Sequence, residues 1–188
     1  QGVFAGIIGE NGHRFASWSD DKQGRAWKSQ HGEIADTSEI HFVDETIRDE
    51  VSALGERTRT YFDIEGLRAE KIEHFNQAGD LVTSETYRYD SNGYESEHTD
   101  INGLITRYTR DHTGRELTRI ERADTSDARI ITTSYYGVTS QPAVITTPET
   151  RTNIYYTTHN SGLLVTQQTI TDLATNQARS TTFTYNGA

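Results

Sequence analysis

The chain lacks cysteine and methionine and has only two prolines among its 188 residues. Without cysteine, disulfide bonds, thiolate catalysis and cysteine-based zinc sites are excluded. Because methionine is also missing, we expect the chain to be a processed or excised fragment of a larger protein. Pro142 and Pro148 bracket a short strand-like run. Since proline cannot donate a ladder hydrogen bond, we expect both at strand ends or at an exposed edge.

Apolar residues are also scarce, at 32% of the chain, and the formal net charge is −10. This acidic excess argues against nucleic acid or an anionic membrane as a partner, because those surfaces attract an excess of Lys and Arg. No apolar run reaches the length of a membrane span. The ten tyrosines, six phenylalanines and two tryptophans are regularly placed, which disfavours disorder and favours a thin, half-exposed sheet.

A short polar residue, two spacers and a glycine recur along the chain. In a type I turn, Asp or Asn at the first position accepts backbone hydrogen bonds, and glycine at the fourth position takes a positive φ. Each copy therefore predicts a hairpin reversal, and the recurrence predicts an array built for its shape. The predicted turn residues are Asp21 and Gly24, Asp63 and Gly66, Asn76 and Gly79, Asp90 and Gly93, Asp100 and Gly103, Asp111 and Gly114, and Gly162 in a weaker copy that begins at His159.

Upstream of these turns, mostly aromatic or β-branched residues alternate with exposed-looking polar residues. This period of two predicts strands with one packed face. In the five better frames, an aromatic residue stands four or six places before the glycine, which is Gly24, Gly66, Gly93, Gly114 or Gly162. The predicted aromatic face consists of Trp18, Phe62, Tyr87, Tyr89, Tyr108, Tyr156 and Tyr185. Since no linker divides the chain, we expect residues 1–188 to form a single all-β array, an antiparallel curved sheet of roughly a dozen or more strands.

Between the turns lie segments that we expect to be the returning strands: 25–31, 67–75, 81–89, 104–110, 116–122, 129–136 and 163–171. The segment 43–54 is ambiguous. Its apolar residues Val43, Ile47, Val51 and Leu54 have helical spacing and precede Gly55, as at a helix C-terminus. β-Branched residues and the repeat frame that follows favour a strand, and a strand is our prediction.

The run from Tyr87 to Gly93 and the run from Gly103 to Tyr108 resemble the YD repeat of bacterial Rhs proteins, which also occurs in insecticidal toxin-complex C components and in teneurins. Residues 11–26 and 163–186 resemble further repeats, so the resemblance covers nearly the whole chain. It departs at Asp20, Arg110 and Thr158, which replace aromatic residues, and at His159, which replaces the aspartate.

The resemblance implies a spiral sheet that forms part of a hollow shell, which encloses a toxin domain or supports adhesion. The implied partners are neighbouring YD repeats and the enclosed toxin, and the implied location is secreted or on the surface of a bacterial cell. The self-cleaving protease region found in many family members carries an Asp-Pro pair, and this chain has none. We therefore expect the chain to be a part of the shell wall that contains neither the protease region nor the toxin domain.

Two sets of residues invite a catalytic or metal-binding interpretation. None of the seven histidines belongs to a three-ligand cluster at recognised spacing, which favours surface or half-buried histidine. A carboxylate pair for glycoside hydrolysis could come from Glu70, Glu73, Glu85, Glu95 and Glu97, yet acidic pairs are expected on a chain of this charge. We expect no enzyme activity, no metal and no cofactor, with turn capping as the role of the repeated Asp residues.

The tyrosines leave a second function open. Exposed aromatic side chains could stack on sugar rings and make the chain a glycan-binding module. Packing in cross-strand ladders is the competing interpretation, and the fixed offsets of the tyrosines from the turns favour it. We also expect the two unpaired edge strands to form a homo-oligomer by edge pairing, unless a terminal segment covers an edge.

Overall fold

The computed structural model describes residues 5–31, 36–65, 68–159 and 162–185, and all regular secondary structure in these ranges is β-strand. The predicted all-β class is confirmed. In the described ranges, no helical segment has the length and apolar character needed to cross a bilayer. The strands are β1 (Gly6–Ile8), β2 (Arg14–Asp20), β3 (Ala26–His31), β4 (Thr37–Phe42), β5 (Ile47–Val51), β6 (Arg57–Phe62), β7 (Ala69–Phe75), β8 (Leu81–Tyr89), β9 (Glu95–Thr99), β10 (Ile105–Arg110), β11 (Glu116–Ala123), β12 (Arg129–Tyr135), β13 (Pro142–Thr146), β14 (Thr150–His159), β15 (Gly162–Asp172) and β16 (Ala178–Thr182).

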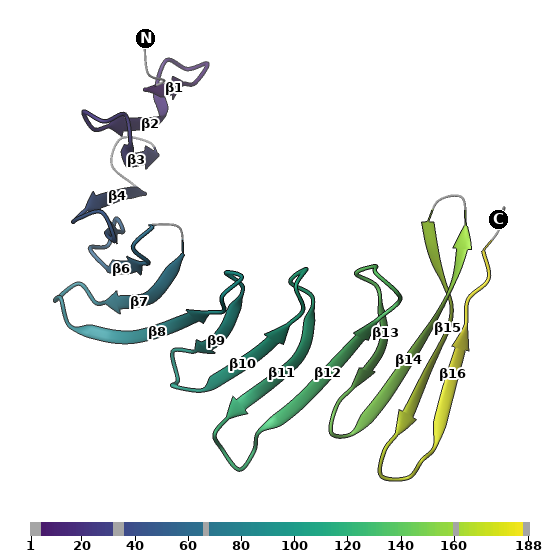
Figure 1. Ribbon diagram of the computed structural model, residues 1–188. Coiled ribbons are helices and arrows are strands. Elements are labelled where there is room, and N and C mark those ends of the chain that lie inside the picture. Colours follow the sequence, from purple (N-terminus) through teal and green to yellow (C-terminus); the bar gives the residue numbers. More distant parts are fainter. Residues whose placement is uncertain (1–4, 32–35, 66–67, 160–161, 186–188) are drawn as a thin grey trace. The chain divides into compact units, whose positions relative to one another are not determined.

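The chain divides into two compact units, Gln1–Tyr87 with Asp100–Gly103, and Arg88–Thr99 with Leu104–Ala188. In the first unit, β1 to β8 pair in sequence order, each antiparallel to the next. In the second unit, β9 to β16 follow the same rule (Figure 1). Antiparallel neighbours in sequence order are joined by hairpins, as predicted.

Neither unit has a thick apolar core. Among the described residues, the only buried apolar side chains are Ala16, Ala123 and Ile131. Large apolar side chains are instead exposed, including Ile8 at 66% and Val82 at 61%. The cohesion of each unit therefore rests on ladder hydrogen bonds, turns and cross-strand side-chain pairs.

The ambiguous segment 43–54 contains β5, so the strand prediction is confirmed and the helical alternative is wrong. Asp44 explains the outcome, because its Oδ1 accepts hydrogen bonds from the backbone of Thr46 at 2.7 Å and of Ile47 at 2.8 Å and reverses the chain there. Both prolines lie where they were predicted. Pro142 begins β13, and Pro148 lies in the turn that follows this strand.

One turn geometry recurs through both units. The N–H of the first turn residue donates to the carbonyl four residues on, and the N–H of the fourth residue, a glycine, donates to the carbonyl of the first. At Asp90, for example, Oδ1 also accepts from Asn92 N at 2.8 Å and Tyr94 N at 2.9 Å. The glycines have φ between 76° and 89°, a range that side chains resist. Turns of this kind begin at Gly9, Asp21, Ser52, Asn76, Asp90 and Asp111.

The predicted turn list differs from the structure at several places. The turns at Gly9 and Ser52 were not predicted, because their first residue is not Asp or Asn. The predicted turn at Asp100 is present, because the Gly103 N–H donates to the Asp100 carbonyl at 2.9 Å, Asn102 N donates to Asp100 Oδ1 at 2.9 Å and Gly103 has φ of 78°. Gly66 lies outside the described residues. Gly162 is not the fourth residue of such a turn, because it begins β15 and pairs directly with His159 across the hairpin.

We predict that Gly114→Ala lowers the free energy of unfolding by more than the about 1–2 kcal/mol that a left-handed conformation costs an L-residue. At φ +85°, an added Cβ would lie 2.6 Å from Cε1 and 2.7 Å from Cζ of Tyr94. Urea denaturation of the variant, alone and in a Tyr94→Ala background, measures the effect. The cost should be smaller without the Tyr94 ring, and an equal cost in both backgrounds would contradict the contact.

Candidate functional surfaces

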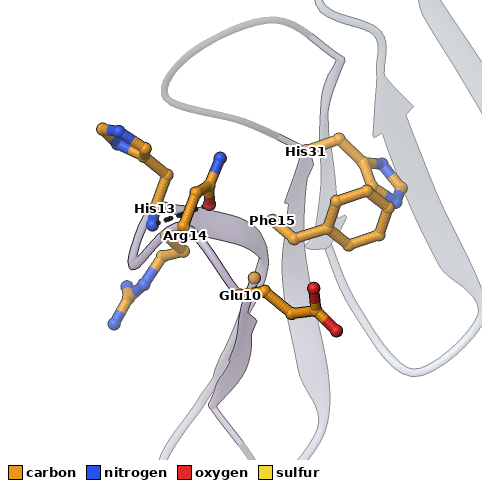
Figure 2. A pocket seen from close by; sticks show the side chains of 7 residues that line it. Glu10, His13, Arg14, Phe15 and His31 are labelled. Atoms are coloured by element: carbon orange, nitrogen blue, oxygen red, sulfur yellow. Dashed lines mark hydrogen bonds between the residues drawn. The ribbon is translucent and has the colours of Figure 1, made fainter.

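A hollow of about 660 Å³ lies beside the β1–β2 hairpin and is the first place to look for a site. Phe15 and His31 meet there edge to face, with ring centroids 5.9 Å apart. Figure 2 shows the side chains of His13 and Arg14 extending away from these two rings. The charged groups do not converge on a point where a substrate atom could sit, so the hollow does not have the geometry of a catalytic centre.

Two histidines of the described chain each lie beside one carboxylate. His41 Nε2 lies 3.6 Å from Glu39 Oε2, and His74 Nε2 lies 3.9 Å from Glu85 Oε1. Within the described ranges, no three His, Asp or Glu side chains come together as a metal would require. A stable site for a transition metal needs at least three protein ligands, and these pairs supply two each.

Of the five acidic residues that could have formed a catalytic pair, Glu73 and Glu97 are held by cations, and Glu73 and Glu85 are held apart. Register places Glu73 and Glu85 on opposite faces of the β7–β8 pair. Lys71 Nζ lies 2.6 Å from Glu73 Oε1 and lowers the pKa of that carboxyl below its usual range. Glu97 is held by Arg107 at 2.7 Å. A general acid needs a raised pKa, so the change at Glu73 is in the wrong direction for that role.

A row of charges crosses one face of the first unit. His41 faces Asp49 across adjacent strands, and Asp49 faces Arg59. Arg59 in turn faces Glu73. Directly opposed residues point to the same side of a sheet, so these four side chains form one row, called the charged row below. Arg59 lies between the carboxylates of Asp49 and Glu73, and Lys71 beside Glu73 supplies a second cation, so both carboxylates have a counter-ion within the chain.

Asp49 has two cationic partners in or beside the charged row, and its side chain is only 9% exposed. Arg59 donates to it twice, from Nε to Oδ1 at 2.6 Å and from Nη2 to Oδ2 at 2.7 Å. Arg57 adds a second cation at 3.7 Å. The hydrogen bonds from Arg59 lower the pKa of Asp49 and raise the pKa of the guanidinium. Both groups are therefore charged in the folded chain, and the pair has a structural role.

A second device ties successive hairpins together along one edge of the first unit. Arg25 follows the turn glycine, and its Nε donates to Asp21 Oδ2 at 2.7 Å. The guanidinium lies 3.8 Å from the ring centre of Phe42, which ends β4 at the next hairpin on that edge. Arg48 continues the stack, 4.3 Å from the ring of Phe62. We call the Asp and Arg of such a turn, with the aromatic ring they reach, a clasp.

The second unit repeats this construction. Arg115 also follows a turn glycine, and its Nε donates to Asp111 Oδ2 at 2.6 Å. Its guanidinium lies 4.9 Å from the ring centre of Tyr135, at the end of β12. The Nη1 atom donates to the Thr139 carbonyl at 2.6 Å in the hairpin that follows β12. The clasp therefore joins the β10–β11 hairpin to the β12–β13 hairpin.

The predictions did not single out the clasp arginines. The signal was in the sequence, since Arg25 and Arg115 both stand directly after the turn glycine. Arg68 stands close behind Gly66 and pairs with Asp63 at 2.9 Å. An Asp and an Arg four or five residues apart across a turn could have predicted these ion pairs from the sequence.

The structure distributes the predicted aromatic face over both units. In the first unit, register and alternation place Trp18, Phe62 and Tyr87 on the face opposite the charged row. Tyr89 lies two residues further along β8. In the second unit, Tyr108 and Tyr156 share one face.

Several tyrosine hydroxyls donate hydrogen bonds to backbone carbonyls. Tyr135 donates to the Glu116 carbonyl, Tyr156 to the Pro142 carbonyl and Tyr185 to the Val165 carbonyl, each at 2.8 Å. Tyr155 differs, because it lies on the opposite face from Tyr156 and is 51% exposed. Tyr135, Tyr156 and Tyr185 are therefore anchored to the backbone, whereas Tyr155 is exposed.

We predict that Asp49→Asn lowers the free energy of unfolding by about 2–3 kcal/mol at pH 7, because it leaves Arg59 and Arg57 without their carboxylate. The folded pKa of Asp49 is lowered, so its stabilisation is present above the unfolded pKa of about 4 and is lost as the pH falls through the folded pKa. Urea denaturation across pH 7 to 2 measures both effects.

Glu50→Gln is the matched control for Asp49→Asn, since Glu50 lies next to Asp49 on the opposite face of β5 and is exposed. Its effect should stay within about 0.5 kcal/mol. An acid dependence of stability that is identical in Asp49→Asn and the unmodified chain would show that Asp49 is not the group that titrates.

Tyr156→Phe should cost about 1 kcal/mol, the contribution of one neutral hydrogen bond, because it removes the bond to the Pro142 carbonyl. Tyr155→Phe removes a hydroxyl that makes no hydrogen bond within the described chain and should be close to neutral. Thermal unfolding of the two variants compares them directly. Equal losses of stability in the two variants would show that the hydrogen bond of the Tyr156 hydroxyl does not stabilise the fold.

No protein-family model matches the chain, and no curated protein sequence matches it. Solved structures do. The crystal structure of TcdB2-TccC3-Cdc42 superimposes with a TM-score of 0.70 at 14% identity, over 92% of this chain and 9% of that chain. The crystal structure of TcdB2-TccC3-TEV gives a TM-score of 0.56 at 12% identity, over 93% of this chain and 11% of that chain.

The chain thus spans about a tenth of the length of the structures it resembles. At these identities the similarity establishes the fold. It agrees with the resemblance to toxin-complex C components that the repeated turns and strands indicated from sequence. The chain has an antiparallel hairpin-repeat fold of the Rhs/YD-repeat type.

Proposed function

We propose that the chain is a segment of wall in an Rhs-type shell that encloses a toxin domain or supports adhesion. The observation that carries the proposal is the ordered series of hairpins, each paired to the next, that superimposes on TcdB2-TccC3 with a TM-score of 0.70. Such a series commits its backbone groups to ladders and leaves no solvent path between neighbouring strands. That property is what a barrier requires.

The side chains support a mechanical role. Cations within the chain balance the carboxylates of the charged row, and the clasps at Arg25 and Arg115 each fasten one hairpin to the next along the edge. Neither arrangement leaves reactive groups converging on a cavity. We therefore propose that the chain is not an enzyme, and turnover on a panel of substrates would overturn this part.

The partners we propose are neighbouring YD repeats and an enclosed toxin domain, in a protein that is secreted or displayed at the cell surface. The first strand, β1, and the last strand, β16, each pair with one neighbour in the described chain. Each therefore has a free edge that can take a further strand from a flanking repeat or from a second copy.

The test is a cryo-electron microscopy structure of the longest natural polypeptide that contains this sequence. We expect the hairpin series to continue beyond both β1 and β16 and to surround density for another part of the polypeptide. A sheet that stands alone, or that packs its face against a folded catalytic domain, would contradict the proposal.

A further inference from the structure

Acidic residues are scarce towards the carboxyl end of the chain. Of the 28 acidic residues, only Asp172 follows Glu149. The register pairs Arg151, Asn153 and Tyr155 of β14 with Thr171, Thr169 and Gln167 of β15. Thr169 and Gln167 in turn pair with Ser180 and Thr182 of β16. The result is one face without a carboxylate, which we call the β14–β16 face: Arg151, Asn153, Tyr155, Gln167, Thr169, Thr171, Ser180 and Thr182.

Amides and hydroxyls on this face are organised by hydrogen bonds. The Thr169 and Ser180 hydroxyls lie 2.8 Å apart, and Gln167 Nε2 donates to Thr169 Oγ1 at 3.3 Å. Tyr155 lies directly opposite Gln167 and is 51% exposed. An outward aromatic ring beside ordered amide and hydroxyl groups offers both an apolar platform and hydrogen-bond partners.

Arg151 is the only charged residue on the β14–β16 face, and it is exposed. Within the described chain it makes no ion pair. The nearest acid in sequence, Glu149, is held by Arg129 at 3.0 Å and by the Thr147 hydroxyl at 2.9 Å. Asp172 lies on the opposite face, where its Oδ1 accepts from the Thr175 backbone at 2.7 Å. The guanidinium of Arg151 therefore lacks a counter-ion in a chain of net charge −10.

We propose that the β14–β16 face binds an acidic oligosaccharide. Tyr155 stacks on one sugar ring, Gln167 and Asn153 bond to sugar hydroxyls, and Arg151 binds a carboxylate of the ligand with two N–H donors. Arg151 and Tyr155 lie on the same face four residues apart, about 13 Å along an extended strand, so the ligand must span more than one sugar. Charge complementarity selects an acidic sugar, because this face has a free cation and no carboxylate to repel it.

The site does not depend on the wall proposal, since a free-standing sheet would present the same face. The probes are tetragalacturonate, which is acidic, and cellotetraose, which is neutral. Isothermal titration calorimetry at low salt should detect tetragalacturonate binding and weaker binding of cellotetraose. Tyr155→Ala should weaken tetragalacturonate binding about tenfold or more, as loss of an aromatic anchor does. Arg151→Gln should remove the preference for the acidic probe.

The controls separate this site from the rest of the surface. Phe15→Ala removes an exposed aromatic ring (63%) in the first unit, outside the β14–β16 face, and should leave binding unchanged. Tyr155→Phe keeps the ring and should retain most of the affinity. Circular dichroism checks that each variant folds. The proposal is overturned if tetragalacturonate does not bind, if it binds Tyr155→Ala and Arg151→Gln as well as the unmodified chain, or if the two probes bind equally.

Discussion

The hydrogen-bond ladder between consecutive strands, closed by four-residue turns, is the constraint on which the rest of the structure depends. Each strand meets only the strands next to it in sequence, so the turns alone decide which residues stand opposite each other. A slip of one residue would move every side chain to the other face. The positive φ of Gly55 fixes the length of a turn within the charged row, and the positive φ of Gly24 and Gly114 does so at two of the clasps.

These cross-strand contacts take the place of a core. With so few buried apolar side chains, cohesion cannot come mainly from apolar burial. The charged row links four consecutive strands through Asp49, Arg59 and their neighbours, while the clasps join the turn of one hairpin to the neighbouring hairpin along the same edge. An arrangement of this kind can be extended by adding hairpins, because no central core limits its size. The proposed wall role depends on this property.

The sequence predicted the class of fold, the pairing of strands by hairpins and most of the turns. It could do so because the Asp of Asp-x-x-Gly accepts backbone hydrogen bonds in a turn and the Gly takes the positive φ that the turn needs. It did not reveal the turn at Ser52 or the clasps, since these depend on which aromatic ring a neighbouring hairpin brings to Arg25 or Arg115. The period of two placed Tyr156 and not Tyr155 in the aromatic face, but the sequence could not show that the Tyr156 hydroxyl reaches a backbone carbonyl while Tyr155 stays exposed. The division into two units had no compositional signal, and the single array of residues 1–188 stays a prediction.

The central claim is that a single-layer ladder, without a hydrophobic core, holds each unit together. Differential scanning calorimetry tests it through the heat-capacity change of unfolding, which reports the apolar surface that unfolding exposes. Globular domains give about 12–15 cal/mol/K per residue. We expect a value clearly below that range for this chain. A value within or above the range would show that a buried apolar core supports the fold, and would contradict the account.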